Sequence, residues 1–284
     1  MKNWIIGVVV LLLAVAGYFY LTSREPADTG AAPPQSPPVV VSRAEPQPEP
    51  ASRPARPEPA VPPGPGLEPV TPPVTDAVPM PMLEDSDPLV LDTLSGLIGE
   101  PAVMRYVVNE NVISRMVATT VTLGSRQVPG VVQVAQGPES SFMVSAVEQP
   151  ETVIRNEEGD AIPQFVTEPE NSQRYTPYVE LFEATDTDEL VALYRGNYSL
   201  FQEAYRQMGY PDGDFDARLL ATIDELLATP EVEQPLALMK PEAYFLFTDP
   251  GLEARPAGQK VLLRMGSENA RRVKAKLVEI RDAL

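Results

Sequence analysis

The sequence predicts a mainly α-helical globular domain at residues 84–284, joined to a membrane by an N-terminal transmembrane helix and a proline-rich linker. Three observations support this prediction. Residues 4–22 carry no charge, residues 23–83 hold 19 of the 33 prolines, and much of the remaining sequence repeats apolar side chains at helical spacing. Apolar residues that recur every three or four positions lie on one face of a helix and mark its buried side.

The predicted anchor is the apolar run at residues 4–22, which follows a short stub at residues 1–3. A helix rises 1.5 Å per residue, so this run spans roughly 30 Å, the thickness of the hydrocarbon core of a bilayer. Trp4 lies at one end and three aromatic residues at the other, as in the aromatic belts of membrane helices. A cleaved signal peptide is the alternative, because Ala14-Val15-Ala16 resembles a cleavage site. The length of the run favours the uncleaved anchor.

The distribution of positive charge predicts on which side of the membrane the domain lies. Lys2 and the amino terminus precede the apolar run, whereas Arg24 on the other side is offset by Glu25 and Asp28. The positive-inside bias then predicts that the stub at residues 1–3 is cytoplasmic. In a Gram-negative bacterium, this arrangement gives a single-pass protein of the inner membrane with its C-terminal domain in the periplasm.

Residues 23–83 predict a disordered linker. Stretches such as EPQPEP, RPARPEP and VPPGPG leave few backbone donors and little apolar surface to bury. Such a segment cannot offset its ordering entropy, and its local preference is the polyproline II conformation. At about 3.1 Å per residue, it reaches on the order of 100–180 Å. We interpret the linker as a spacer; a docking site for a proline-binding partner is the alternative.

Helix start and stop signals recur along residues 84–284 and predict six to eight helices with short connections. The start signals are capping residues followed by acids, and the stop signals are Gly or Pro after the last apolar position. The region around 125–170 contains short apolar runs broken by Pro and Gly, so it is either a small hairpin or loops packed on helices. The predicted helical segments are 86–99, 101–123, 186–209, 214–229, 235–247, 257–265 and 267–284.

The composition excludes several kinds of chemistry. Cys and His are both absent, so the chain has no disulfide, thiolate nucleophile, cysteine zinc site or Ser-His-Asp triad. It carries no GxSxG, SxxK, Walker or Rossmann signature. A net charge of −18 argues against nucleic acid as a partner, because phosphates favour basic surfaces. We therefore assign no catalytic, cofactor-binding or metal-binding residue and expect no cofactor.

Three segments of the C-terminal half are RYTPYVELFEATDTDELVALYRGNYSLFQEAYRQMGYPDGDF, LLATPEV and AGQKVLLRMGSENARRVKAKLVEIR. They resemble a bacterial envelope family, the domain of unknown function 3014 family. The resemblance covers residues 84–284 and is strongest from Arg174 onward, whereas the region around 125–170 departs from the pattern. It implies a single domain, a single-pass anchor with a proline-rich linker, and an envelope location. It implies no activity and no site residue.

Aromatic side chains recur at helical spacing at Tyr194, Tyr198, Phe201 and Tyr205. This spacing predicts the buried face of a helix. The alternative is a ledge on which sugars or peptides stack.

Three acidic residues on alternate positions, Asp212, Asp214 and Asp216, resemble the first half of a calcium-binding loop. Such a loop needs Gly at its sixth position and Glu at its twelfth, where this chain has Ala217 and Ile223. We therefore interpret these acids as the cap and first turn of a helix.

Charge is divided unevenly along the domain. Residues 84–254 contain 9 basic and 30 acidic side chains, whereas residues 255–284 contain 8 basic and 3 acidic ones. The basic side chains of the last predicted helix would suit an anionic partner such as lipid head groups or a wall polymer. The alternative is that they complement a helix terminus and the acidic body of the same domain. The candidate interaction surface consists of Arg271, Arg272, Lys274, Lys276 and Arg281.

These features predict a non-enzymatic docking module of the cell envelope. The expected partners are an envelope protein or a cell-wall polymer, besides the inner membrane through residues 4–22; the oligomeric state stays open. The alternative is a carboxylate-dependent hydrolase that acts on an envelope polymer. A deep cleft with a buried carboxyl group of raised pKa would favour the hydrolase. A third hypothesis is lipid contact through the last helix.

The predicted orientation can be tested with a reporter fused after Leu284 that is active only in the cytoplasm. We expect the reporter to stay inactive, because the domain is predicted to lie outside the cytoplasm. Reporter activity in intact cells would contradict this orientation.

Overall fold

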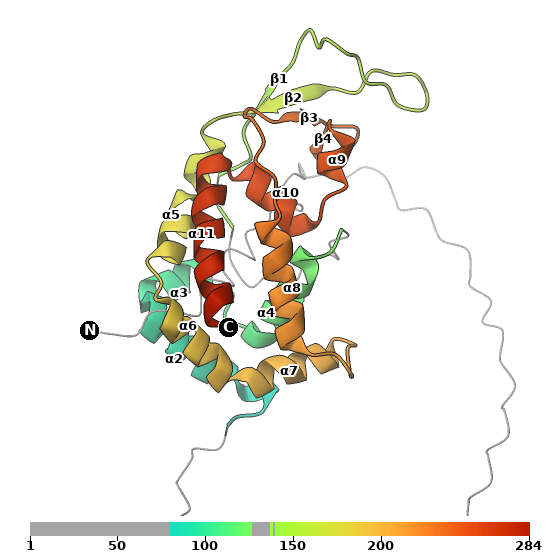
Figure 1. Ribbon diagram of the computed structural model, residues 1–284. Coiled ribbons are helices and arrows are strands. Elements are labelled where there is room, and N and C mark those ends of the chain that lie inside the picture. Colours follow the sequence, from blue (N-terminus) through green and yellow to red (C-terminus); the bar gives the residue numbers. More distant parts are fainter. Residues whose placement is uncertain (1–79, 127–136, 139) are drawn as a thin grey trace, which may run out of the picture. The chain divides into compact units, whose positions relative to one another are not determined.

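The computed structural model describes residues 80–126, 137–138 and 140–284 (Figure 1). The predicted anchor at residues 4–22 and nearly all of the predicted linker at residues 23–83 lie outside the described residues. Within the described part, no helix combines the length and the hydropathy that a membrane span requires. This part forms ten α-helices, one 3-10 helix and one four-stranded sheet, so the globular domain is mainly helical, as predicted.

The helices come in three groups that are separated by two pairs of strands. In chain order the elements are η1 (Leu83–Asp85), α2 (Asp87–Ile98), α3 (Glu100–Tyr106), α4 (Val112–Leu123), β1 (Val144–Ala146), β2 (Gln164–Thr167), α5 (Asn171–Glu183), α6 (Thr187–Gly196), α7 (Tyr198–Gln207), α8 (Phe215–Leu227), β3 (Ala237–Met239), β4 (Leu246–Phe247), α9 (Pro250–Glu253), α10 (Ala257–Arg264) and α11 (Ser267–Ala283).

The segment predicted as one helix at residues 101–123 is two helices, α3 and α4. The break includes Asn111, whose φ of 53° is left-handed and cannot continue a helix. The first N–H groups of α4 are capped from another helix, because the Asp87 carboxylate accepts hydrogen bonds from the backbone of Asn111 at 2.7 Å and Val112 at 2.8 Å. This cap comes from a residue 25 positions away, so local sequence signals do not reveal it.

The segment predicted as one helix at residues 186–209 is also two helices, α6 and α7. Asp186 caps α6 as predicted, since its side chain accepts from the backbone N–H groups of Asp188 and Glu189. The helix ends at Gly196, because Asn197 takes non-helical backbone angles (φ −112°, ψ 12°); its side-chain amide donates to the Leu193 carbonyl at 3.0 Å. These two breaks help to raise the number of helices above the predicted six to eight.

The prediction of a helix at residues 235–247 is wrong. The segment forms β3 and β4 of an antiparallel sheet with strand order β1-β2-β3-β4. Leu238 is fully buried and lies opposite Phe165 on β2 and Phe247 on β4. Apolar residues in a run this short fit a strand or a helix equally well, and pairing with β2 selects the strand.

The region around 125–170 contains the other two strands. Of the two structures predicted for it, a small hairpin or loops packed on helices, the hairpin is confirmed. In β1 and β2, Val144 pairs with Thr167 and Ala146 with Phe165. In Figure 1 this sheet lies at one end of the bundle of helices, beyond α10. A small apolar cluster joins the sheet to α10; its buried members are Leu236, Leu238, Phe247 and Leu263.

The main core lies between the helices and is organised around α11. This helix packs against α5, α6, α8 and α10. The predicted apolar stripe is confirmed, because Val273, Leu277 and Ile280 are all buried. Figure 1 shows α11 between α5 and α8, so both flanks of its buried stripe face other helices.

Gly258 on α10 marks the closest approach of α10 to its neighbours. A Cβ atom at this position would lie 2.4 Å from Leu226 Cδ2 and 3.1 Å from the Leu123 carbonyl oxygen. We therefore expect Gly258→Ala to lower the free energy of unfolding by about 1–3 kcal/mol, because overpacking outweighs the gain in helix propensity. Denaturant unfolding of the full-length chain, followed by circular dichroism, measures this change.

Gly196 on α6 supplies the matched control, because a Cβ atom there would meet nothing within 4 Å. We expect Gly196→Ala to be neutral or stabilising by up to about 1 kcal/mol. A Gly258→Ala variant as stable as Gly196→Ala would contradict the close packing of α10.

Candidate functional site

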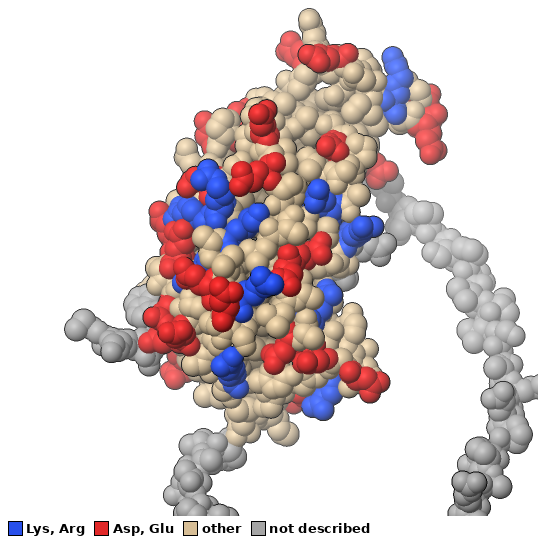
Figure 2. Space-filling view, in the orientation of Figure 1, with Lys and Arg blue, Asp and Glu red and all other residues tan. Residues whose placement is uncertain are grey.

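The five basic residues of the candidate interaction surface all lie on α11. Figure 2 shows basic side chains standing among acidic ones on the face that contains this helix. The structure gives each of the five an intramolecular partner. The partners differ on the two flanks of the helix, so the flanks are described in turn.

The flank of α11 that faces α5 and α6 carries Arg272 and Lys276. The Arg272 guanidinium forms a two-pronged ion pair with the Glu183 carboxylate, whose hydrogen bond raises the pKa of Arg272. Lys276 is buried, and its Nζ lies 2.9 Å from Glu279 Oε2. The same oxygen accepts a hydrogen bond from Thr187 on α6 at 3.1 Å. Both cations therefore have partners within the domain.

The hydrogen bond from Lys276 also lowers the pKa of the Glu279 carboxyl, with Thr187 contributing in the same direction. A carboxylate that accepts hydrogen bonds from its neighbours is stabilised in its charged form. This pair is an internal ion pair, with the ammonium group buried and the carboxylate more than half exposed.

The flank that faces α8 carries Lys274 and Arg281. Lys274 Nζ donates to the Thr229 carbonyl at 2.8 Å, next to the C-terminal end of α8, where a cation complements the helix dipole. Arg281 Nε lies 2.8 Å from Asp224 Oδ1 on α8. Arg281 and Asp224 are both about half exposed, so their pairing adds little to stability.

Arg271 is the most exposed of the five basic residues. Its guanidinium lies 2.8 Å from Glu268 one turn earlier, and the two side chains are 58% and 67% exposed. An ion pair this exposed is worth at most about 1 kcal/mol. A partner with a better-placed anionic group could therefore displace Glu268 at small cost.

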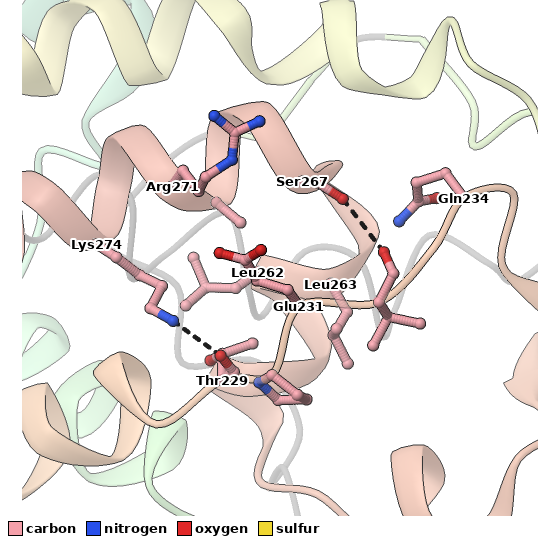
Figure 3. A pocket seen from close by; sticks show the side chains of 11 residues that line it. Thr229, Glu231, Gln234, Leu262, Leu263, Ser267, Arg271 and Lys274 are labelled. Carbon is pink, nitrogen blue, oxygen red and sulfur yellow. Dashed lines mark hydrogen bonds between the residues drawn. The ribbon is translucent and has the colours of Figure 1, made fainter.

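A small pocket opens beside Arg271 and Lys274, between α11, α10 and the segment at 229–234. We call it the α10–α11 pocket. In Figure 3 Lys274 reaches toward Thr229, and Arg271 stands at the outer rim. Ser267 at the start of α11 donates to the Val232 carbonyl at 3.3 Å and holds the segment against the helix. The lining residues are Thr229, Pro230, Glu231, Val232, Gln234, Leu262, Leu263, Ser267, Ala270, Arg271 and Lys274.

The size of the α10–α11 pocket limits what it can hold. It offers about 20 Å³, which is room for about one water-sized group. Pockets for small molecules typically offer about 300–1,000 Å³. The α10–α11 pocket therefore suits the tip of one side chain of a partner rather than a substrate.

Two larger hollows exist among the described residues. One, of about 280 Å³, lies between α6, α8 and the end of α11, and we call it the α6–α8 hollow. The other, of about 320 Å³, lies beside the ring pair of Tyr106 and Tyr178. Its lining includes Gly137, Pro138 and Ser140, which are next in sequence to positions outside the described residues.

The prediction that the aromatic stripe forms a buried helix face is confirmed for Tyr194, Phe201 and Tyr205, which are all buried. Tyr198 is half-buried, and its ring meets that of Tyr194 edge to face at 6.1 Å between centroids. The stripe is divided between α6 and α7, and the buried rings pack on Phe215 of α8.

The acidic residues at the start of α8 act as predicted for a helix cap. The Asp214 side chain accepts from the Asp216 backbone N–H at 3.0 Å. Tyr194 donates a short hydrogen bond to Asp216, and the Tyr198 hydroxyl lies 3.1 Å from Asp214 Oδ1. Burial and the hydrogen bond to Asp214 raise the pKa of Tyr198 to about 12. No group of three or more candidate metal ligands occurs among the described residues.

The distribution of buried polar groups bears on the hydrolase alternative. In the described part of the chain, no Asp or Glu is buried, and Lys276 is the one charged residue that is. A catalytic carboxyl group of raised pKa requires a buried, poorly solvated site. The described residues therefore give the hydrolase alternative no support.

Sequence reasoning identified the basic residues of α11 and missed the groups opposite them. The α10–α11 pocket needs the segment at 229–234, and the α6–α8 hollow needs Arg195 and Leu220 from different helices. No local pattern marks these residues, because each site is assembled from elements that are distant in sequence.

The described residues form a mainly helical domain with a small antiparallel sheet. The family described as protein of unknown function (DUF3014) matches residues 112–281, which is more than half of the chain. The chain belongs to this family, which confirms the resemblance; the match begins after α3. No curated protein and no solved structure matches the chain.

The Lys276–Glu279 pair predicts how stability depends on pH. The pKa of Glu279 is lower in the folded domain than in the unfolded chain. Glu279 therefore makes its full contribution to the free energy of unfolding above the pKa of an unfolded Glu. This contribution is lost as the pH falls through the pKa that Glu279 has in the folded domain. We expect Glu279→Gln to lower the free energy of unfolding by about 1 kcal/mol at neutral pH. The free energies of unfolding of parent and variant, measured by denaturant unfolding, should become equal as the pH falls from about 5 to about 3.

Lys276→Met is the matched variant for this pair. It removes the buried charge and keeps the volume, so it should cost less stability than Glu279→Gln, which leaves the ammonium group without its carboxylate. A larger loss for Lys276→Met, or a Glu279→Gln effect that does not change with pH, would contradict this account.

Proposed function

We propose that the protein is a membrane-tethered docking module of the bacterial cell envelope. Residues 4–22 anchor it in the inner membrane, residues 23–83 act as a spacer, and the helical domain binds an envelope protein or a cell-wall polymer in the periplasm. The chemistry of the domain lies in recognition rather than catalysis. The α10–α11 pocket is the proposed contact point with the partner.

One observation carries this proposal: the α10–α11 pocket combines an apolar interior with a charged rim. Leu262 and Leu263 supply apolar surface, and the rim consists of Arg271, Lys274 and the acidic Glu231. An apolar anchor bordered by charge is typical of the centre of a protein interface. Two basic residues against one acidic residue leave the rim with a net positive charge, which favours a small anionic group of the partner, such as a carboxylate.

The small size of the α10–α11 pocket favours a docking role over catalysis on a bound substrate. About 20 Å³ accommodates one side-chain tip, which contributes orientation and specificity within a larger contact. A long spacer has the same implication, because a tether is useful when the partner is fixed at a distance from the membrane.

Arg272 and Lys276 form ion pairs within the domain, so fewer basic residues of α11 are available to a partner. Arg272 is paired with Glu183 and Lys276 is buried, so reversing their charges would disturb the fold as well as any contact with anionic lipid. Arg271 lies on the surface, and its substitution leaves the packing of α11 intact. Arg271→Glu is therefore the cleaner test of docking.

In-cell photo-crosslinking tests the docking site. A crosslinking amino acid placed at the exposed pocket residue Glu231 should capture a discrete envelope component, and Arg271→Glu should reduce the capture at least about fivefold by reversing the charge of the rim. The captured component is identified by mass spectrometry.

The same crosslinker at Val278, which is 43% exposed on the outer face of α11, is the control. We expect little capture there, because Val278 lies away from the lining of the pocket. Equal capture from the two positions, or capture at position 231 that Arg271→Glu does not change, would contradict docking at this pocket.

A further inference from the structure

The α6–α8 hollow is a second surface site with its own chemistry. It offers about 280 Å³, close to the lower limit for pockets that bind small molecules. Its lining comes from α6, the start of α7, α8 and the end of α11; α11 packs against both α6 and α8, and α7 packs against α8, so the core supports the walls of the hollow. The space is sufficient for one or two sugar-sized rings and far exceeds that of the α10–α11 pocket.

The charged groups of the hollow are one carboxylate and one guanidinium. Asp216 and Arg195 are both exposed and both line it. With one charged side chain of each sign, the side chains of the lining carry no net charge that would select a simple anion or a simple cation. The hollow contains both strong acceptors and strong donors.

Both charged groups are held in place while keeping hydrogen-bonding capacity. A carboxylate has about four acceptor positions, and the Tyr194 hydroxyl uses one of those on Asp216. A guanidinium has five donors, and the bonds from Arg195 to the backbone oxygens of Ala283 and Leu284 both come from Nη2. Asp216 and Arg195 are thus positioned before any ligand arrives.

Neutral groups complete the lining. Leu219 and Leu220 supply apolar surface, and the half-buried Tyr198 adds an aromatic ring and a hydroxyl. Burial and Asp214 keep the pKa of Tyr198 high, so the hydroxyl stays neutral at physiological pH. The combination is an apolar surface with neutral and charged hydrogen-bonding groups at its edge.

We propose that the α6–α8 hollow binds a sugar residue of an uncharged glycan. The hydroxyl groups of a sugar both donate and accept hydrogen bonds, so one can donate to the Asp216 carboxylate and another can accept from the Arg195 guanidinium. The C–H face of a sugar ring packs on apolar and aromatic surface, which Leu220 and Tyr198 provide. The ligand class is therefore a neutral polyhydroxylated ring.

This inference deepens the proposed function, because it names the chemistry of a wall-polymer partner and rests on the proposed envelope location. It does not depend on the α10–α11 pocket. The two proposals fail separately, since one is tested by capture at residue 231 in cells and the other by binding of a purified sugar.

Isothermal titration calorimetry of the full-length chain tests the inference. The probes are the β-1,4-linked tetramers of N-acetylglucosamine and of glucose, and the detergent must lack a sugar head group. We expect at least one tetramer to bind, and Asp216→Asn to raise its Kd at least about tenfold by weakening a charge-assisted hydrogen bond.

Asp224→Asn is the matched control, because Asp224 lies on the same helix outside the hollow and is about half exposed. It should change the Kd less than about twofold. Arg195→Gln should weaken binding as Asp216→Asn does, and circular dichroism should show that all three variants are folded.

Three results would overturn the proposal. The first is no binding of either tetramer at millimolar concentration. The second is equal weakening by Asp216→Asn and Asp224→Asn. The third is displacement of the bound tetramer by free glycine or glutamate, which would assign the same pair of charges to an amino-acid zwitterion.

Discussion

Burial of the last helix holds this domain together. Helix α11 packs against α5, α6, α8 and α10, so its apolar stripe joins these four helices in the helical core, and α4 likewise joins α2, α7, α8 and α10. Buried Asn269 fixes its position, because the side-chain amide donates to the Ser172 carbonyl at the start of α5 and to the Met265 carbonyl at the end of α10. The core is therefore completed only when the last element of the described chain docks, which makes the fold dependent on non-local contacts.

The central position of α11 also explains its basic character. Both of its flanks face helices that carry carboxylates or expose a carbonyl end, so cations there stabilise the packing of the helix. These residues were expected either to bind an anionic partner or to make contacts within the domain. Contacts within the domain account for Arg272, Lys274 and Lys276. Arg271 and Arg281 differ, because each pairs with a carboxylate that is about as exposed as itself. The proposed docking site is consequently a small part of the basic helix rather than its whole face.

The sites of the domain differ in size and therefore in what they can recognise. The α10–α11 pocket admits one side-chain tip, whereas the α6–α8 hollow admits a ring. Both have charged groups at the surface and apolar groups beneath, and the described residues bury no carboxylate. Such sites are suited to binding through surface complementarity. This is the physical basis for interpreting the domain as a recognition module.

Local signals in the sequence determined the helical class, the caps at Asp186 and Asp214, and the buried stripe of α11. These features depend on residues within a few positions of one another, so periodicity and capping rules suffice. The strand at residues 237–239 was decided by pairing with β2, some seventy positions earlier, and the strand at residues 246–247 pairs in turn with the strand at residues 237–239. The partner of Arg272 was likewise decided by packing, because Glu183 lies 89 positions away. The sequence by itself supplied the charged and apolar groups, and only the tertiary structure determined which of them meet, because those contacts join helices and strands that are far apart in the chain.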